Sequence, residues 1–103
     1  MQLANTSQQL LPRWVKSFRP TEGLYVFEAI LQEEESGYSV FAPHYPGVIS
    51  QGDTVKESVD NISEAFALMI ECSREDGIPL RYIPIPEIES RESDIRIRVE
   101  VNA

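Results

Sequence analysis

The segment from Thr54 to Asp76 constrains the fold more than any other, because the sequence marks both of its ends as the ends of a helix. Thr54 is followed three residues later by Glu57, and this capping box satisfies the first N–H groups of a helix. Gly77 is the residue type that ends helices in the left-handed conformation, and Pro79 prevents the helix from resuming. The predicted helix is about 34 Å long, enough to cover one face of a three-stranded sheet.

Apolar residues within this helix recur at positions that share one side. The stripe consists of Val55, Val59, Ile62, Phe66, Met69 and Ile70, with Ala65 and Ser73 near its edge. Charged residues lie mostly opposite, so the helix is predicted to pack on the rest of the domain through this stripe. Cys72 is the one cysteine of the chain and falls in the same segment. It has no partner for an intrachain disulfide, and we expect a small packed side chain.

Two runs of aromatic and β-branched residues precede the helix and predict a β-hairpin. The first covers residues 24–31 and the second covers residues 38–42. The polar segment 32–37 between them contains a glycine, as a hairpin turn requires.

The connection from the hairpin to the helix is predicted to bend before it adds a short third strand. Pro43 and Pro46 cannot donate ladder hydrogen bonds, and Gly47 permits a positive φ. The apolar pair Val48–Ile49 then predicts the strand. We expect that Gly47 and Gly52 hold backbone conformations that a β-carbon would resist.

Two extended segments are predicted after the helix. Residues 78–86 contain three prolines, which suit a rigid crossing segment or an edge strand. The stretch 94–101 alternates without a break. Its apolar side chains share one side: Ile95, Ile97, Val99 and Val101. This strand must pair either with the domain's own sheet or with the same strand of a second subunit, because an unpaired apolar strand would aggregate.

These patterns divide the chain into three parts. Residues 1–22 are predicted to be an N-terminal arm, partly disordered or with one short helical turn. Residues 23–86 are predicted to be the domain, and residues 87–103 a linker and C-terminal strand.

Composition limits the chain to one domain with an acidic surface. It has 103 residues, and 17 aspartates and glutamates against 9 lysines and arginines give a formal charge of −8. This charge repels phosphate backbones, so direct DNA binding is not expected and a cationic partner is favoured. The chain has neither a signal-peptide pattern nor an apolar run of the roughly 18 residues that span a bilayer. We therefore expect a cytoplasmic protein.

No group of residues predicts an active site, so we expect neither catalysis nor a cofactor or metal. His44 is the one histidine, lies in a turn and is interpreted as structural. Cys72 lies near the C-terminal end of the helix, where the helix dipole disfavours the thiolate that a catalytic pair with His44 needs. An alternative remains in which Glu28, Asp53 and Asp60 hold the metals of a nuclease, although chance alone groups some carboxylates among 17 acids.

Residues 38–65 resemble the HicB antitoxin family. Members of that family carry a strand followed by Pro, then Pro-Gly, a short strand, and a Gly-Asp-Thr helix start. This chain has the same order, YSVFAPHYPGVISQGDT, followed by a helix that contains Glu-Ala, and the likeness extends over about residues 24–82. The motif is carried by Pro43, Pro46, Gly47, Gly52, Asp53 and Thr54.

The resemblance implies an α+β fold with the order β-β-β-α-β. A three- to four-stranded, mainly antiparallel sheet would pack on one long helix, as an incomplete ribonuclease H-like arrangement. It also implies a non-catalytic protein that binds a small basic HicA-type toxin, which cleaves mRNA, and blocks its active histidine. The charge of −8 suits such a partner, because opposite fields accelerate encounter.

Contact with the toxin is expected at the acidic hairpin residues Glu33, Glu34 and Glu35, whose alternative interpretation is a solubilising turn. Many family members append a DNA-binding module, and only about twenty residues follow the domain here. We therefore expect a stand-alone form that does not bind DNA, although Arg96 and Arg98 would allow a ribbon-type reader made by two chains. We expect the chain to form a homodimer or homotetramer. The alternative to an antitoxin is an orphan homo-oligomeric domain of the same fold with another protein partner.

Overall fold

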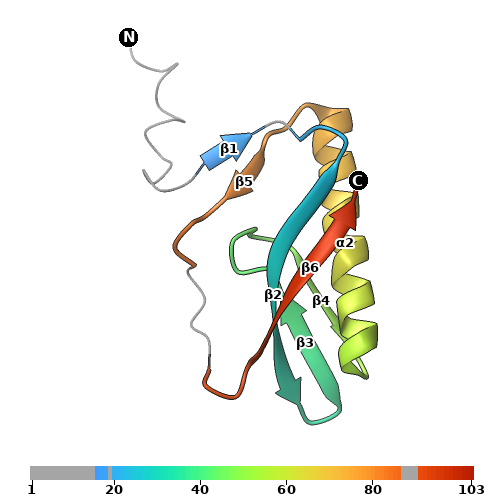
Figure 1. Ribbon diagram of the computed structural model, residues 1–103, viewed down its shortest axis with the longest axis vertical. Coiled ribbons are helices and arrows are strands. Elements are labelled where there is room, and N and C mark those ends of the chain that lie inside the picture. Colours follow the sequence, from blue (N-terminus) through green and yellow to red (C-terminus); the bar gives the residue numbers. More distant parts are fainter. Residues whose placement is uncertain (1–15, 19, 87–90) are drawn as a thin grey trace.

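The computed structural model describes residues 16–18, 20–86 and 91–103. Within them one long helix packs on one face of a four-stranded antiparallel sheet, and a two-stranded sheet lies at one end (Figure 1). The elements in chain order are β1 (Lys16–Phe18), β2 (Leu24–Glu34), β3 (Gly37–Phe41), β4 (Ile49–Gly52), α2 (Val55–Asp76), β5 (Leu80–Tyr82) and β6 (Ile95–Asn102). The predicted α+β class, with an antiparallel sheet on a single long helix, is confirmed.

The four-stranded sheet has the order β4-β3-β2-β6, and every neighbouring pair is antiparallel. β2 and β3 form the predicted hairpin. β6 lies along the other side of β2, with Phe27 opposite Val99. Gly23 and Ala103 close this ladder by exchanging backbone hydrogen bonds of 3.1 and 3.0 Å. The C-terminal strand therefore pairs along one side with a strand of its own chain, which answers the question that its alternation left open.

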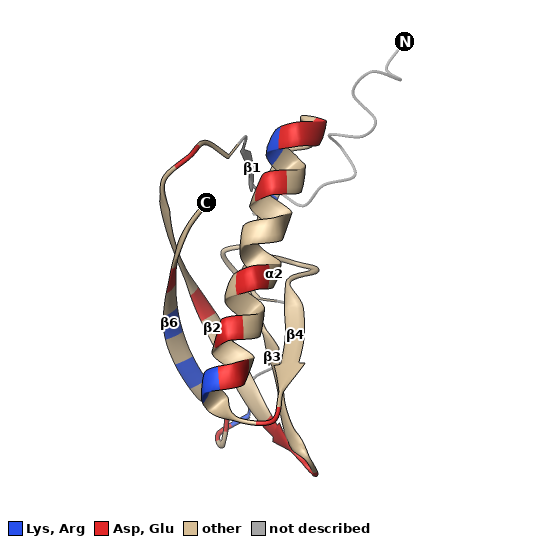
Figure 2. Cartoon of the chain, turned by 90° about the vertical axis from the view of Figure 1, so that its right-hand side faces the viewer, with Lys and Arg blue, Asp and Glu red and all other residues tan. Residues whose placement is uncertain are grey.

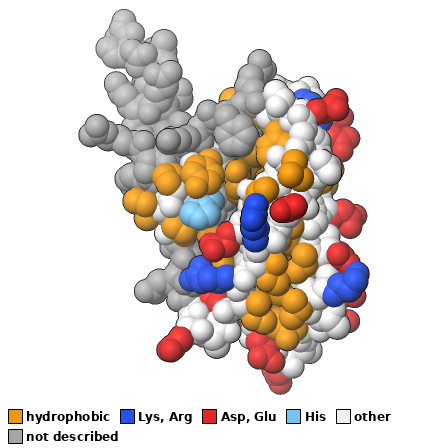
Figure 3. All heavy atoms as spheres, in the orientation of Figure 1, with side chains coloured by type: hydrophobic (Ala, Val, Ile, Leu, Met, Phe, Trp, Pro, Cys, Tyr) orange, Lys and Arg blue, Asp and Glu red, His pale blue; other side chains and the backbone are white. Residues whose placement is uncertain are grey.

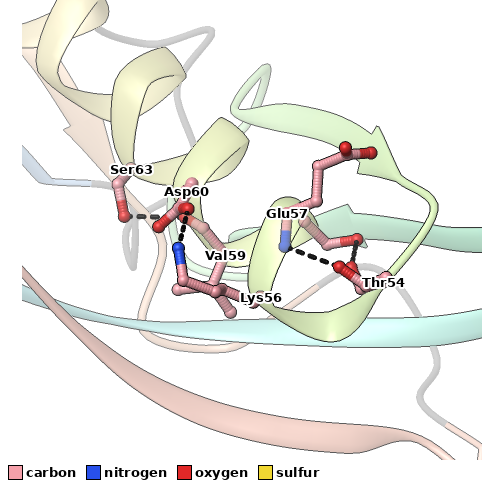
Figure 4. Close-up of polar contacts among 7 residues, drawn as sticks. Thr54, Lys56, Glu57, Val59, Asp60 and Ser63 are labelled. Carbon is pink, nitrogen blue, oxygen red and sulfur yellow. Dashed lines mark hydrogen bonds and ion pairs between the residues drawn. The ribbon is translucent and has the colours of Figure 1, made fainter.

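Both predicted ends of the helix are confirmed. Thr54 Oγ1 accepts a hydrogen bond of 3.0 Å from the N–H of Glu57 (Figure 4). The Glu57 carboxylate in turn accepts a hydrogen bond of 2.7 Å from the N–H of Asp53, one residue further back than in the usual capping box. At the other end Gly77 has a φ of 70°, in the left-handed region that ends many helices.

The core lies between the helix and the sheet. β2 contributes Phe27, Ala29 and Leu31, and the rings of Phe27 and Phe66 are stacked with centroids 4.2 Å apart. The buried residues of α2 are Ser58, Ile62, Phe66, Ile70 and Ser73. The other members of the predicted stripe are partly buried against the same cluster, so burial of this stripe is what holds α2 on the sheet. Ser58 is a fully buried position that apolar periodicity could not indicate.

β1 and β5 form a separate antiparallel pair, in which Lys16 lies opposite Tyr82 and Phe18 opposite Leu80. β5 thus bears out the extended segment that the prolines after the helix predicted. The expectation for the N-terminal arm falls mostly outside the described residues. At residues 16–18 the backbone is an extended strand and not part of a helical turn, because pairing with β5 supplies hydrogen bonds that an isolated turn lacks.

Candidate protein-binding surface

One row of side chains on the exposed side of α2 is almost entirely acidic. It follows the helix in steps of three or four residues, which return to the same side of a helix. We call this row the acidic stripe, and it consists of Glu57, Asp60, Glu64, Leu68, Glu71 and Glu75. Figure 2 shows the acidic positions along the helix. The stripe places a negative field on the side of α2 that faces away from the sheet.

Leu68 interrupts the acidic stripe near its centre. Its side chain is 60% exposed. Together with Glu64, Glu71 and Ser50 of β4 it lines a hollow of about 510 Å³. A single exposed leucine is ordinary, but a leucine set in a hollow between carboxylates can take up an apolar group of a cationic partner. The middle of the stripe therefore combines negative charge with an exposed apolar side chain.

Only part of the acidic stripe takes part in the ion pairs of the described residues. Lys56 and Asp60 form an ion pair of 2.8 Å (Figure 4), and the hydrogen bond to Asp60 raises the pKa of Lys56. Within the described ranges, no ion pair involves Glu64, Glu71 or Glu75. The glutamates without an ion pair therefore begin at Glu64, and Arg74 is the one basic residue in the last turn of the helix.

The three hairpin glutamates do not share one face. Glu33 and Glu34 are the last two residues of β2, and Glu35 begins the turn. Side chains alternate along a strand, so Glu33 lies on the helix side of the sheet, as Leu31 does, and Glu34 on the other. Glu34 is 4.0 Å from the guanidinium of Arg91. All three glutamates are exposed.

A second hollow joins the hairpin tip to the start of the helix. It has a volume of about 480 Å³, and its lining includes Glu34, Asp53 and Glu57. Asn61 also lines it and donates a hydrogen bond of 2.8 Å to the carbonyl of Gln51. Negative charge thus extends from the stripe to the hairpin tip. We call the acidic stripe, Asp53 and the three hairpin glutamates together the acidic surface.

The structure does not bring together the three carboxylates considered for a nuclease. Glu28 lies on the opposite face of the sheet from α2, 3.5 Å from Arg96. Asp60 is paired with Lys56, and Asp53 precedes the helix. Among the described residues, no three His, Cys, Asp or Glu side chains are grouped so that they could hold a metal ion. The arrangement of these residues offers no site for metal-assisted hydrolysis.

His44 has a structural role, as expected. Its Nδ1 lies 2.6 Å from the carbonyl of Ile83, which can only accept, so Nδ1 carries the proton. The N–H of Ile83 donates back to the carbonyl of His44 at 2.8 Å. The imidazole is stacked on Tyr82 with ring centroids 5.3 Å apart. Tyr45 packs against the same tyrosine, and burial, followed by the nearby Tyr82 and Tyr25, raises the pKa of Tyr45.

Cys72 is exposed, so the expectation of a packed side chain was wrong. Cys72 follows the buried Ile70 by two residues, and two residues turn a helix by about 200°, which directs the side chain away from the core. Within the described residues it makes no hydrogen bond to His44, whose Nδ1 is engaged by Ile83. The pair therefore does not form a catalytic dyad.

The motif residues shape the connection between the hairpin and the helix. Gly47 has a φ of 92°, the positive value that its place in the bend required. Pro43 is buried and Pro46 is exposed. The bend is closed by a hydrogen bond of 2.9 Å from the N–H of Ala42 to the carbonyl of Val48. The remaining motif residues stand where β4 passes into α2: Gly52, Asp53 and Thr54.

Comparison with known proteins identifies relatives in two bacteria. A UPF0150 protein of Synechocystis sp. is 43% identical over 65 residues, which are 62% of this chain and 76% of that protein. A UPF0150 protein of Helicobacter pylori is 36% identical over 45 residues, which are 44% of this chain and 62% of that protein.

Two solved structures share the fold. The N-terminal domain of the Burkholderia pseudomallei antitoxin HicB has a TM-score of 0.62 and 21% identity, covering 77% of this chain and 100% of that one. A chain of the HicA3 and HicB3 toxin–antitoxin complex has a TM-score of 0.55 with the same identity and coverage.

No helix in the part of the chain that the structure describes is long and apolar enough to cross a membrane.

A family model agrees with these likenesses in fold and sequence. The model, described as the HicB_like antitoxin of bacterial toxin–antitoxin systems, matches residues 27–94. The match begins within β2, ends just before β6 and includes the whole helix. Because it spans more than half of the chain, the protein belongs to the HicB-like antitoxin family of bacterial toxin–antitoxin systems.

Proposed function

We propose that this protein neutralises a small basic HicA-type toxin, an RNA-cleaving protein, by binding it through the acidic surface. The observation that carries the proposal is the acidic stripe, in which unpaired glutamates flank the exposed Leu68. One of the structures with the same fold comes from a HicA3 and HicB3 toxin–antitoxin complex. Such a role would place the protein in the cytoplasm, where mRNA is translated.

Charge and shape have separate parts in this proposal. The net charge of −8 attracts a basic protein over a distance and raises its association rate. The hollow at Leu68 would hold the complex together once formed, because a few well-packed contacts carry most of the binding energy in protein interfaces. The hairpin glutamates, Glu33, Glu34 and Glu35, would contact the toxin at the end of the acidic surface.

The same distribution of charge argues against direct contact with DNA. A DNA-binding face needs lysines and arginines that neutralise phosphates. α2 carries six acidic residues and two basic ones. On the other face of the sheet, Arg96 is 3.5 Å from Glu28 and Arg98 is 3.7 Å from Glu100. We therefore propose an antitoxin domain that acts on its protein partner alone.

The test is to co-express the chain with the small basic protein encoded beside it and to measure binding and inhibition of RNA cleavage. We expect a complex, loss of cleavage and rescue of growth. Absence of all three would overturn the antitoxin proposal and favour the orphan domain with another partner.

A charge-reversal pair locates the surface. The double variant Glu64→Lys with Glu71→Lys replaces the two negative charges beside Leu68 by positive charges. We expect the affinity for the toxin to fall by about a hundredfold, because a few contacts become repulsive. The matched control is Glu22→Lys with Glu92→Lys, which changes the net charge equally at two exposed positions outside the acidic surface. Equal losses in the two double variants would show that net charge, and not this surface, decides binding. Glu33→Gln with Glu35→Gln tests the hairpin tip in the same assay.

A further inference from the structure

The two edge strands of the four-stranded sheet differ in length and regularity. β4 is four residues long and leads directly into the helix. β6 is eight residues long, is regular throughout and contains neither proline nor glycine. Natural sheets protect a long edge by prolines, bulges or short strands, because its unpaired backbone groups invite another strand. Among the described residues, the one protective feature of β6 is a row of charged side chains, and Arg98 and Glu100 in this row carry opposite charges.

Backbone groups of every second residue of β6 point away from β2. Gly23 and Ala103 exchange two hydrogen bonds and so form a hydrogen-bonded pair. Such pairs alternate along an antiparallel ladder, so Val99 also bonds to β2. The N–H and C=O groups of Arg98 and Glu100, on either side of Val99, point to the outer edge. A second strand can pair there only in certain registers. Its residues whose N–H and C=O groups point toward β6 must lie opposite the even-numbered residues of β6.

One antiparallel register of β6 with its own copy suits both the backbone and the charges. With a two-fold axis at Val99, Arg98 of each copy lies opposite Glu100 of the other. An axis at Arg98 sets that arginine opposite itself, and an axis at Glu100 sets the glutamate opposite itself. An axis at Ile97 sets Arg96 opposite Arg98. Like charges directly opposite destabilise a sheet and unlike charges stabilise it, so the axis at Val99 is favoured.

The charged side chains are placed to make these contacts. Those of Arg98 and Glu100 are 73% and 56% exposed, so both can reach a neighbouring strand. They lie on the face of the sheet away from the helix. Figure 3 shows acidic and basic side chains beside one another on the side of the molecule that it views.

The same register continues the apolar row of β6 on the helix side. Val99 faces its own copy in a close non-hydrogen-bonded pair, and Ile97 lies opposite Val101. Ile95, which is 37% exposed in the single chain, lies opposite Ala103. Pairs of β-branched side chains across neighbouring strands stabilise antiparallel sheets.

We propose that two copies of this chain associate through antiparallel pairing of their β6 strands about an axis at Val99. The two four-stranded sheets become one continuous sheet of eight strands, with both helices on the same face. The hollow at Leu68 opens beside β4, at the other edge of each sheet, so the acidic stripe stays accessible in the dimer.

Complementary charge reversal tests the pairing in the full chain. Sedimentation velocity and native mass spectrometry, at low salt and up to about 1 mM protein, measure the dimer. We expect the wild type to dimerise and Arg98→Glu and Glu100→Arg each to raise the dimer Kd at least about tenfold, because both cross-strand pairs become repulsive. An equimolar mixture of the two variants should form heterodimers with a Kd near that of the wild type, since both pairs are then attractive again.

This mixture also controls for folding, because misfolded variants cannot rescue one another. A monomeric wild type at the highest concentration would overturn the proposal. So would dimers that neither single variant weakens, or a mixture that stays monomeric.

A cysteine pair tests the register directly in a Cys72→Ser background. In the proposed dimer the two Val99 Cα atoms are about 4.5 Å apart, within the range of a disulfide. We expect Val99→Cys to give a disulfide-linked dimer on mild oxidation. Val101→Cys is the matched control, because its two copies would be about 13 Å apart. Cross-linking of the control as fast as of Val99→Cys would overturn the register.

Discussion

A β-carbon added to Gly52 would lie 2.6 Å from the backbone nitrogen of Ser58, so the end of β4 touches the first turn of α2 at a point where only glycine fits. The sequence predicted that the backbone conformation of Gly52 would resist a β-carbon. That reason was wrong, because Gly52 is not among the glycines with a positive φ. Close approach of two backbones requires the glycine. Ser58 is fully buried at this contact, and its hydroxyl donates a hydrogen bond of 2.8 Å to the carbonyl of Thr54.

Gly52→Val should lower the free energy of unfolding by about 1–3 kcal/mol, because β4 and α2 must move apart. Urea denaturation followed by circular dichroism measures the change. The smaller Gly52→Ala meets the same backbone nitrogen, so its cost should persist when Ser58→Ala removes the hydroxyl as well. Full recovery in that double variant would assign the clash to the side chain instead.

Thr54→Ala removes the oxygen that accepts the N–H of Glu57 at the start of the helix. We expect a loss of about 0.5–2 kcal/mol in the free energy of unfolding. Thr54→Ser keeps an oxygen in the same place and should stay close to the wild type. If alanine and serine are equally stable in thermal denaturation, the cap does not contribute.

Asp94 holds the turn that leads into β6. Its carboxylate accepts hydrogen bonds of 2.6 Å from the N–H of Arg91 and 3.2 Å from the side-chain amide of Gln32. Burial by itself would raise the pKa of Asp94, but these hydrogen bonds and the positive charges of Arg91 and Arg96 outweigh it, so the pKa lies below its usual value.

A carboxyl whose pKa is lowered by folding stabilises the protein above its unfolded-state pKa, and this stability is lost as the pH falls through the folded-state value. Asp94→Asn should therefore be less stable than the wild type near neutral pH, and the difference should shrink below about pH 4. Urea midpoints measured over that range provide the test. A difference that does not change with pH would mean that ionisation of Asp94 plays no part.

Leu68 is exposed and Ile62 is fully buried on the same helix, so the two positions should respond differently to truncation. Leu68→Ala should change the free energy of unfolding by less than about 0.5 kcal/mol, because the side chain is mostly exposed. Ile62→Ala should cost about 2–5 kcal/mol, because it leaves a cavity in the core. If Leu68→Ala weakens toxin binding in isothermal titration calorimetry while its stability stays unchanged, the leucine serves the interface. Unchanged binding would remove it from the proposed contact.

Local patterns predicted the helix and the hairpin because each depends on residues that are close in sequence. Neighbouring residues alone are enough to recognise three of these patterns: the capping box at Thr54, the glycine at 77 and the alternation of residues 95–101. The partner of β6 could not be predicted, since alternation states which side chains share a face and not which strand lies alongside. The pairing of β1 with β5 and the tight contact at Gly52 were missed for the same reason.

The candidate surface was predicted only in part. Net charge indicated a cationic partner, and the hairpin glutamates were the most concentrated acids in the sequence. The more extensive row on α2 is spread over the helix, so it becomes visible only when residues three and four apart are read as neighbours. That signal was present in the spacing of Glu64, Leu68 and Glu71.

The order of strands also affects how the domain forms during synthesis. β3 and α2 can associate with β2 while the chain is still being made, but β2 receives its second neighbour from residues 95–102. Until those residues leave the ribosome, one side of β2 is open and the apolar row that includes Phe27 and Ala29 lacks part of its cover. Pairings between distant segments form slowly. We therefore expect β2 to be open to non-native strand pairing until residues 95–102 are made.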